Sequence, residues 1–237
     1  MTADEPHDEL TMPAAAVNKR RYYALMLVGI ILPFLLYPFL GMIFYSSGKD
    51  YTLHLTVSRL LIWAVLGLLV LYARYAEVQK FLLWRDEKYG FKFYAVSFVV
   101  LWLVVFVAGY ISRIPALLGW HDNYSLMIRM MQIMKAHPVL LVFGSISAGI
   151  TEELYCRGYM LSRLSLFFKN KYIPVIISAL MFSCAHLGYK NLREIIYTFL
   201  FGMIFGYHYQ KYRNIKVLII LHVAIDLFAF LFYGLHK

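Results

Sequence analysis

Seven long apolar runs follow one another along the chain, and this succession restricts the fold more than any other feature of the sequence. They lie at residues 22–45, 55–74, 93–112, 138–160, 173–188, 194–210 and 215–235. A transmembrane helix needs roughly 20 predominantly apolar residues. Of the 237 residues, 62% are hydrophobic and 15% are charged, whereas soluble domains average about 25% charged. We therefore predict an all-α fold, a polytopic transmembrane helical bundle of about seven to eight spans.

The apolar runs divide the chain into three parts. Residues 1–21 are polar, and we expect them to form a disordered cytoplasmic tail. Residues 22–137 are expected to supply N-terminal transmembrane helices and their connecting segments. Residues 138–235 are expected to form a helical core, because the unusual polar residues described below lie there.

Two local features refine this picture. Pro33 and Pro38 fall inside the first apolar run and predict a kink in its helix. The stretch "YSLMIRMMQIMKA", residues 124–136, predicts an amphipathic helix that lies on the membrane surface.

The net charge of +10 bears on orientation. With the basic cluster at residues 19–21 in the cytoplasm and seven spans, most of the lysines and arginines fall on the cytoplasmic side, as the positive-inside rule requires. We therefore expect an integral protein of a bacterial cell membrane with a cytoplasmic N-terminus and with membrane lipids as partners. We expect no nucleic-acid partner, because the sequence shows no soluble basic surface.

Acidic residues are rare in the second half of the chain, and their positions are unexpected. From residue 89 onward they are Asp122, Glu152, Glu153, Glu194 and Asp226. Glu152, Glu153 and Asp226 lie within apolar runs, as do His186 and His222. An ionisable side chain inside a membrane helix costs a few kcal/mol, so these residues are functional candidates.

The stretch "ITEELYCRGYM", residues 150–160, places Glu153 and Arg157 four residues apart. This spacing puts both on one helix face, with the acid before the base, which is the favourable order for an ion pair. Glu152 lies about 100° further round the helix, since an α-helix has 3.6 residues per turn. The spacing predicts that Arg157 neutralises Glu153 and leaves Glu152 free for chemistry, although the pair taken alone favours a structural ion pair.

Two further polar pairs occur at the same spacing. Phe182 and His186 are four residues apart, as are His222 and Asp226. A carboxylate near an imidazole can hold and deprotonate a water molecule, and a second polar pair can bind the oxyanion that forms when water attacks an amide. The three clusters together would suit amide hydrolysis without a serine or cysteine nucleophile. Taken alone, His222 and Asp226 would also suit a hydrogen bond within their own helix, and His186 would suit hydrogen bonding between helices.

In their order and spacing, the three clusters resemble the CPBP family of intramembrane proteases, which includes CAAX prenyl endopeptidases and bacterial Abi proteins. The family pattern EExxxR, FxxxH and HxxxN or HxxxD is matched by residues 152–157, 182–186 and 222–226. The resemblance covers roughly residues 138–235, which would be the catalytic core.

The resemblance implies a role for each of these residues. Glu152 and His186 would activate a water molecule, while His222 and its partner Asp226 would stabilise the oxyanion. An ionised Asp accepts hydrogen bonds but cannot donate them. Asp226 would therefore either orient the His222 ring or be protonated in its apolar setting, and both alternatives stay open.

The remaining motif residues would support this chemistry. Arg157 would position or neutralise Glu153, and Phe182 would shape the pocket behind His186. We favour a mechanism without a metal, because the sequence has no HExxH helix. A divalent ion such as zinc is the alternative, since these side chains include zinc ligands.

The leading functional hypothesis is an intramembrane endopeptidase, similar to CAAX proteases, that acts on a peptide or a lipidated protein. The alternative is a non-catalytic membrane protein of the bacteriocin-immunity or scaffold kind, in which the polar clusters serve only helix packing.

Overall fold

The computed structural model describes residues 19–45 and 50–232, apart from the side chains of residues 41–45. Within these ranges the chain forms helices and connections, with no strand. The long helices are α1 (Lys19–Tyr45), α2 (Tyr51–Tyr75), α3 (Phe91–Ile111), α6 (Pro138–Glu153), α8 (Tyr172–Cys184), α9 (Leu192–Tyr212) and α10 (Ile215–Phe232). Shorter elements are α4 (Ile114–Leu117), α5 (Ser125–Ala136), α7 (Ser162–Leu164), the π-helix η1 (Leu154–Leu161) and the 3-10 turn η2 (Leu187–Tyr189).

Each of the seven predicted apolar runs corresponds to a helix, which confirms the all-α fold. The first helix begins at Lys19, so residues 19–21 form its first turn; residues 1–18 of the expected tail and the end of the last run lie outside the described residues. In the described part of the chain, six segments are long and apolar enough to span a membrane. They are Lys19–Leu40, Tyr51–Tyr75, Phe91–Leu117, Pro138–Leu164, Tyr172–Tyr189 and Ile215–Phe232.

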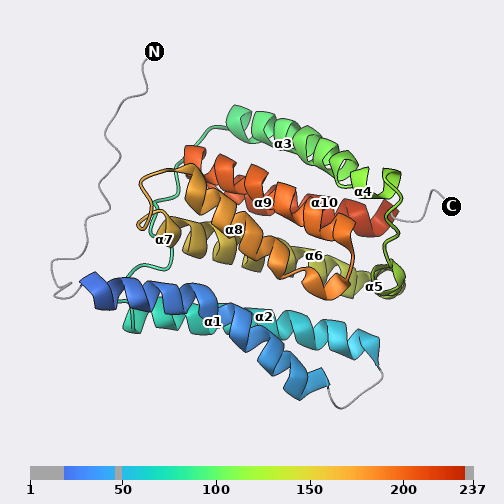
Figure 1. Cartoon of the computed structure of the whole chain (residues 1–237), viewed down its shortest axis with the longest axis horizontal. Coiled ribbons are helices and arrows are strands. Elements are labelled where there is room, and N and C mark those ends of the chain that lie inside the picture. The colour runs from blue at the N-terminus through green and yellow to red at the C-terminus, as the bar shows by residue number, and fades with distance from the viewer. Residues whose placement is uncertain (1–18, 46–49, 233–237) are drawn as a thin grey trace.

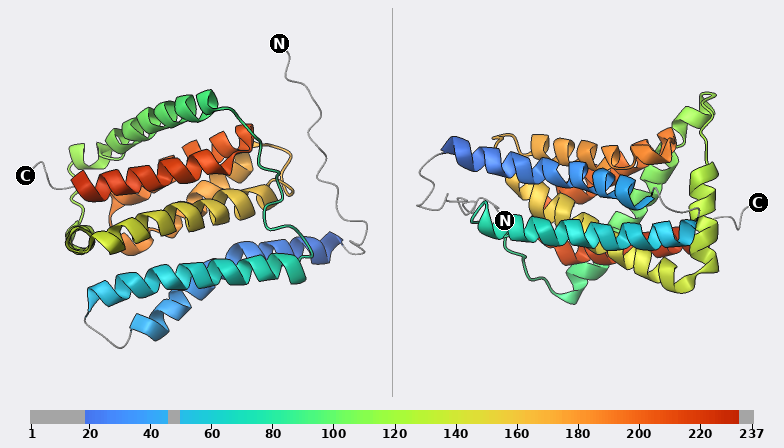
Figure 2. Two further views of the ribbon diagram at one scale, coloured as in Figure 1. Left: turned by 180° about the vertical axis from the view of Figure 1, so that it is seen from behind. Right: turned by 90° about the horizontal axis from the view of Figure 1, so that it is seen from below.

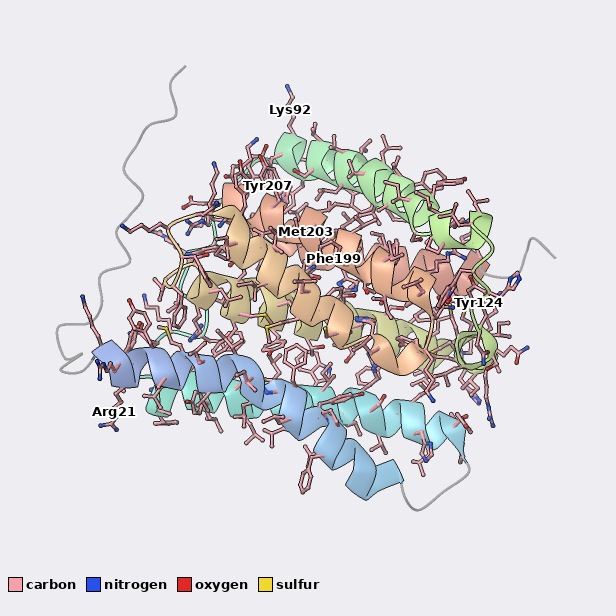
Figure 3. All side chains as sticks on the ribbon, in the orientation of Figure 1. Arg21, Lys92, Tyr124, Phe199, Met203 and Tyr207 are labelled. Carbon is pink, nitrogen blue, oxygen red and sulfur yellow. The ribbon has the colours of Figure 1, made fainter. Side chains whose placement is uncertain are left out.

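The helix α9, predicted as a further span, is not among these six. It has 21 residues, but its first turn contains Arg193 and Glu194 and its last turn contains Lys211. Its middle is apolar, and Figure 3 shows Phe199, Met203 and Tyr207 along one face of it. Because α9 packs extensively against α8 and also against α3, it belongs to the bundle.

The long helices run side by side in layers (Figure 1). The helices α1 and α2 pack against each other at one side of the molecule, and α3 lies at the opposite side. The elements α6, η1, α8, α9 and α10 fill the space between them and supply most of the buried residues.

Two predicted local features are present. The helix α1 contains Pro33 and Pro38 and bends along its length in Figure 1, as the prolines predict. The amphipathic stretch at residues 124–136 forms α5, which runs across the end of the bundle in Figure 2. This helix turns Met131 and Met134 inward and contacts α6 and α10.

Glycines bring the central helices into close contact. A Cβ atom on Gly149 of α6 would lie 3.0 Å from the backbone nitrogen of Val223 in α10. A Cβ atom on Gly202 of α9 would lie 2.9 Å from the Cα atom of Ala179 in α8. Small residues allow such close approach between membrane helices. Gly149 matters most for the site, because it precedes Glu152 and Glu153 by one turn.

Connecting segments cap two of the central helices. The carboxylate of Asp122 accepts hydrogen bonds from the backbone nitrogens of Leu192 and Arg193 at the start of α9, at 2.7 and 3.1 Å. The carboxylate of Asp86 accepts one from Ile215 at the start of α10, at 2.8 Å. The first backbone nitrogens of a helix have no hydrogen-bond partner within it, so these two carboxylates fix where α9 and α10 begin.

A buried ion pair attaches the end of α2 to α7. The guanidinium of Arg163 donates to the carboxylate of Glu77, with Nη2–Oε2 at 2.5 Å and Nε–Oε2 at 2.9 Å. Both side chains are fully buried. The hydroxyl of Tyr159 donates to the same carboxylate at 2.5 Å. The sequence analysis did not identify this network.

Candidate active site

The paired glutamates lie where the α-helix changes to a π-helix. Glu152 and Glu153 are the last residues of α6, and the next eight residues wind as the π-helix η1. Such wider turns often occur at functional sites. The Nη1 atom of Arg157 lies 3.0 Å from Oε1 of Glu153, and the two side chains are 1% and 0% exposed. The prediction that Arg157 pairs with Glu153 is therefore confirmed.

Aromatic rings enclose the Arg157 guanidinium. Its Cζ atom lies 4.7 Å from the ring centre of Phe182, 5.5 Å from that of Phe205 and 5.7 Å from that of Phe201. A guanidinium in such positions is attracted to ring faces. The Phe182 ring also lies 4.8 Å from the ring of His186. Phe182 therefore neighbours both the arginine and this histidine.

The His222 ring is held by Glu153. Its Nδ1 atom lies 2.7 Å from Oε1 of Glu153, and because a carboxylate accepts, Nδ1 is the donor. Its Nε2 atom lies 4.0 Å from Oε2 of Glu152 and 3.9 Å from Oδ1 of Asp226. The close approach of α10 at Gly149 makes this arrangement possible.

The expectation that Asp226 orients the His222 ring is not met. The short hydrogen bond to the ring comes from Glu153, whereas the Asp226 oxygen lies beyond hydrogen-bond distance of the other ring nitrogen. Asp226 remains partly exposed, with 26% of its side-chain surface accessible. The carboxylates of Asp226 and Glu152, whose side chain is 19% exposed, lie on either side of a common neighbour, at 3.9 and 4.0 Å from Nε2 of His222.

His186 follows α8, where the chain leaves the helix before the turn η2. Its Nδ1 atom lies 2.8 Å from the backbone oxygen of Phe182. A carbonyl oxygen only accepts, so Nδ1 carries the hydrogen and Nε2 of the neutral ring can accept a proton. The ring also stacks on Tyr189, with centres 5.9 Å apart.

Glu152 and His186 line one cavity of about 740 Å³. It lies between the α1–α2 pair and the elements α6, η1 and α8, which Figures 1 and 2 show side by side. Its walls are mainly apolar and include Leu66 and Leu69 of α2. The lining thus includes Glu152 of the first motif and Phe182 and His186 of the second. His222 of the third motif lies next to Glu152, with Nε2 4.0 Å from Oε2.

A residue that the sequence analysis missed also lines this cavity. Arg59 of α2 interacts electrostatically with Glu152 and Asp226. Its Nε atom is buried and has no hydrogen-bond partner among the described residues. The signal was present in the sequence, because Arg59 is a basic residue within the apolar run 55–74. An intramembrane arginine is a functional candidate for the same reason as an intramembrane acid.

In the part of the chain with described positions, no group of three or more His, Cys, Asp or Glu side chains is arranged to hold a metal ion. Cys156 is buried in η1, with no thiol hydrogen bond among the interactions of the described residues.

The fold and the site define a class of protein: an integral membrane protein with a cluster of acids and histidines inside its helical bundle. Residues 135–228 match the family model described as type II CAAX prenyl endopeptidase Rce1-like. The match includes all three motifs and confirms the resemblance to the CPBP family. It supports a CAAX-protease-like intramembrane endopeptidase as the general class. No curated protein and no solved structure matches the chain.

The matched segment covers α6 to most of α10 and leaves out α1, α2 and α3. One wall of the cavity, with Arg59, therefore comes from outside the matched segment. The six candidate spans and the membrane-protease family together indicate an integral membrane protein.

Proposed function

We propose that this protein is an intramembrane endopeptidase in which Glu152 and His186 activate a water molecule. The observation that carries this proposal is that both side chains line one cavity within the bundle, with the His222 ring held 4.0 Å from Glu152 by Glu153. A carboxylate beside an imidazole is a suitable pair for general acid–base catalysis.

The proposed reaction proceeds in two steps. The water oxygen attacks the peptide carbonyl carbon while Glu152, assisted by His186, takes its proton, and a tetrahedral oxyanion forms. The proton then passes to the amide nitrogen, the carbon–nitrogen bond breaks, and a carboxylic acid and an amine leave. In the first step, Nε2–H of a protonated His222 donates to the oxyanion, because its Nδ1 already donates to Glu153.

Arg59 has a supporting role in this proposal. Its positive charge lies near the carboxyl groups of Glu152 and Asp226 and would offset their negative charge. An ionised Glu152 is the form that can accept a proton from water. Asp226, as an acceptor, would help to keep His222 protonated rather than bind the oxyanion itself.

The proposed substrate is a peptide or a lipidated protein tail. The mainly apolar walls of the cavity suit apolar peptide side chains and a lipid group on the substrate. The family description, a prenyl endopeptidase, adds isoprenylated peptides to the substrates that we propose.

The test is cleavage of fluorogenic peptides, with and without an isoprenylated cysteine, by the purified protein in lipid nanodiscs. We expect Glu152→Gln to lower the cleavage rate by about 10²- to 10⁴-fold. The matched control is Glu87→Gln, which alters an exposed glutamate outside the six spans. Full cleavage by the Glu152→Gln protein would refute the proposal. A non-catalytic scaffold would keep its biological activity in this variant.

A parallel assay with a chelator addresses the metal. We propose that water activation needs only Glu152 and His186, so the cleavage rate should stay the same in the chelator. A loss of cleavage that zinc restores would show that the mechanism without a metal is wrong while leaving the endopeptidase proposal intact.

A further inference from the structure

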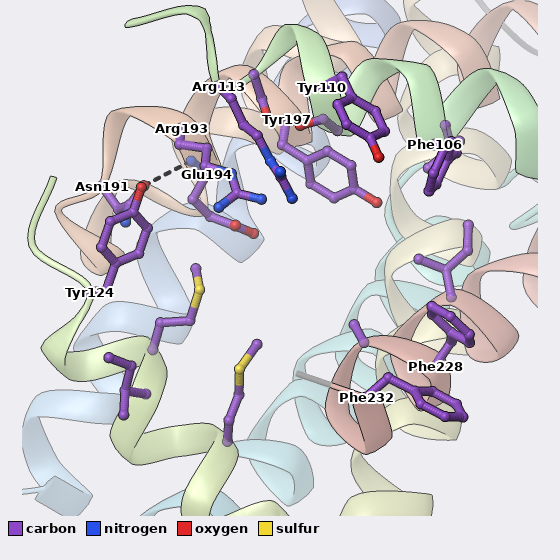
Figure 4. A pocket seen from close by; sticks show the side chains of 18 of the residues that line it. Phe106, Tyr110, Arg113, Tyr124, Asn191, Arg193, Glu194, Tyr197, Phe228 and Phe232 are labelled. Atoms are coloured by element: carbon purple, nitrogen blue, oxygen red, sulfur yellow. Dashed lines mark hydrogen bonds between the residues drawn. The ribbon is translucent and has the colours of Figure 1, made fainter. Parts of the chain in front are cut away.

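A second cavity, of about 760 Å³, lies apart from the proposed catalytic cavity. The elements α3, α5, α9 and α10 enclose it (Figure 4). One part of its lining is charged and polar, and another is aromatic. The charged residues that line it, among those described, are Arg113, Lys135, Arg193 and Glu194. The aromatic residues include Trp102, Phe106, Phe228 and Phe232.

The charged part gathers cations at one rim. In Figure 4 the side chains of Arg113 and Arg193 lie close to each other and to Glu194, while Phe228 and Phe232 form a separate wall. Neither arginine makes a salt bridge with a described residue. The described lining of the cavity has three cationic side chains, those of Arg113, Lys135 and Arg193, and one carboxylate, that of Glu194, which leaves an excess of positive charge.

The start of α9 already has an anion bound to its backbone. The Asp122 carboxylate accepts hydrogen bonds from the backbone nitrogens of Leu192 and Arg193, where the helix dipole favours a negative charge. The side chain of Arg193 instead lines the cavity beside Arg113. Its guanidinium can therefore contact a second anion that enters the cavity.

A buried donor points to the same ligand. Asn191 is 1% exposed and lines the cavity. Its Oδ1 atom accepts a hydrogen bond from the backbone nitrogen of Glu194 at 3.1 Å, as an N-cap residue does. Its Nδ2 atom is buried and has no hydrogen-bond partner among the described residues. Such a donor is costly unless an acceptor reaches it.

The two parts of the cavity together match an amphipathic anion. The cavity lies at the end of the bundle where α5 crosses, next to the C-terminal end of the α3 span. There a phosphate group would meet the arginines and Asn191, and an acyl chain would follow the aromatic wall. We propose that this cavity is a binding site for an acidic glycerophospholipid, with its phosphate at Arg113, Arg193 and Asn191.

The test is thermal unfolding of the protein in nanodiscs of phosphatidylcholine with increasing phosphatidylglycerol. A ligand that binds only the folded state raises the unfolding temperature. We expect Arg193→Gln and Arg113→Gln each to need about fivefold more phosphatidylglycerol for the same rise. The control is Lys190→Asn, which removes one exposed charge at the same end of the bundle. Asn tolerates the positive φ of 53° at this position.

A further variant separates the ligand from the helix cap. Asn191→Asp keeps the N-cap acceptor but replaces the free amide donor with a carboxylate, so the rise in unfolding temperature should be lost in phosphatidylglycerol while the protein stays folded in phosphatidylcholine. Inorganic phosphate added to phosphatidylcholine nanodiscs should have no effect. The proposal is overturned if Lys190→Asn weakens the response as much as Arg193→Gln, if Asn191→Asp responds like the natural protein, or if inorganic phosphate alone gives the full rise.

Discussion

Two buried glutamate–arginine pairs within the bundle differ in how fully their hydrogen bonds are satisfied. The Glu77–Arg163 pair has two short bonds, at 2.5 and 2.9 Å, and Tyr159 donates a third to the carboxylate. The Glu153–Arg157 pair has one bond of 3.0 Å. Among the described residues, Oε2 of Glu153 and Nη2 of Arg157 have no hydrogen-bond partner.

This difference separates a structural role from a functional one. A fully satisfied buried network makes one arrangement rigid, and the Glu77–Arg163 pair joins two segments without lining either cavity described above. In the pair of Glu153 and Arg157, some hydrogen-bond donors and acceptors have no partner among the described residues, and Oε1 of Glu153 also accepts a hydrogen bond from His222. Unsatisfied buried groups in a native protein call for an explanation, and a catalytic role is one of the few available.

The largest expected effect is on stability, from Arg163→Met. This change leaves the fully buried Glu77 carboxylate without its cation, and breaking a buried pair in this way costs about 3–5 kcal/mol. Chemical unfolding in mixed micelles measures the loss. The control is Lys216→Ala, because Lys216 is 64% exposed and lies 3.4 Å from Asp86. An exposed pair contributes about 1 kcal/mol or less.

The cleavage rate per folded molecule should be unchanged in the Arg163→Met protein, since the Glu77 network lies outside the proposed catalytic cavity. A stability loss no larger than that of Lys216→Ala would contradict the structural role of this pair.

The second expected effect comes from the matching change Arg157→Met. The stability loss should be smaller, about 2–3 kcal/mol, because His222 still donates to Glu153 and the long Met side chain can occupy the aromatic surroundings. The cleavage rate should fall by at least about 10²-fold, as expected when a residue that positions catalytic groups is lost. Unfolding and cleavage assays on both arginine variants compare the pairs directly. If the same arginine variant showed the larger loss in both unfolding and cleavage, the proposed distinction between the two pairs would be wrong.

The third comparison uses isosteric changes of the two acids. Glu153→Gln keeps an acceptor for Nδ1 of His222 but removes the charge, and should reduce the free energy of unfolding by about 1–2 kcal/mol. The cleavage rate should fall by about tenfold or more, because a neutral partner stabilises a protonated His222 less well. Glu77→Gln should affect unfolding alone. Equal cleavage rates in the two variants would show that Glu153 does not support His222.

Much of the fold was predictable because its main signal is local. Each apolar run became a helix, and the prolines in the first run and the amphipathic pattern at residues 124–136 had the expected consequences. The pairing of Glu153 with Arg157 was predictable for the same reason, since it depends only on the spacing of residues along one helix.

The contacts between helices could not be read from the sequence. The bond from His222 to Glu153 depends on how closely α10 approaches α6 at Gly149, and one glycine in an apolar run does not say which helix it meets. The role of Asp226 was left open on this account, because the sequence places it only relative to its own helix. Arg59 was overlooked, although a basic residue within an apolar run is as unusual as an acid there.

Arg163 shows a different difficulty. The sequence interpretation counted it among the basic residues that set the orientation in the membrane, yet it is fully buried. Its partner Glu77 lies 86 residues away along the chain. A charge near the end of a span therefore has two interpretations, an exposed orientation signal or a buried structural partner, and only the packing distinguishes them.

The smallest expected effects concern two tyrosines of η1. Tyr159→Phe removes one hydrogen bond to Glu77, and Tyr155→Phe removes one to the backbone oxygen of Ile30, each at 2.5 Å. Each loss should cost about 0.5–1.5 kcal/mol in unfolding. Tyr155 lines the proposed catalytic cavity, whereas Tyr159 does not. Only Tyr155→Phe should therefore change the KM for peptide cleavage, which initial-rate measurements on both variants would detect. A change in KM for Tyr159→Phe alone would mean that the fully satisfied network, and not the cavity, is near the substrate.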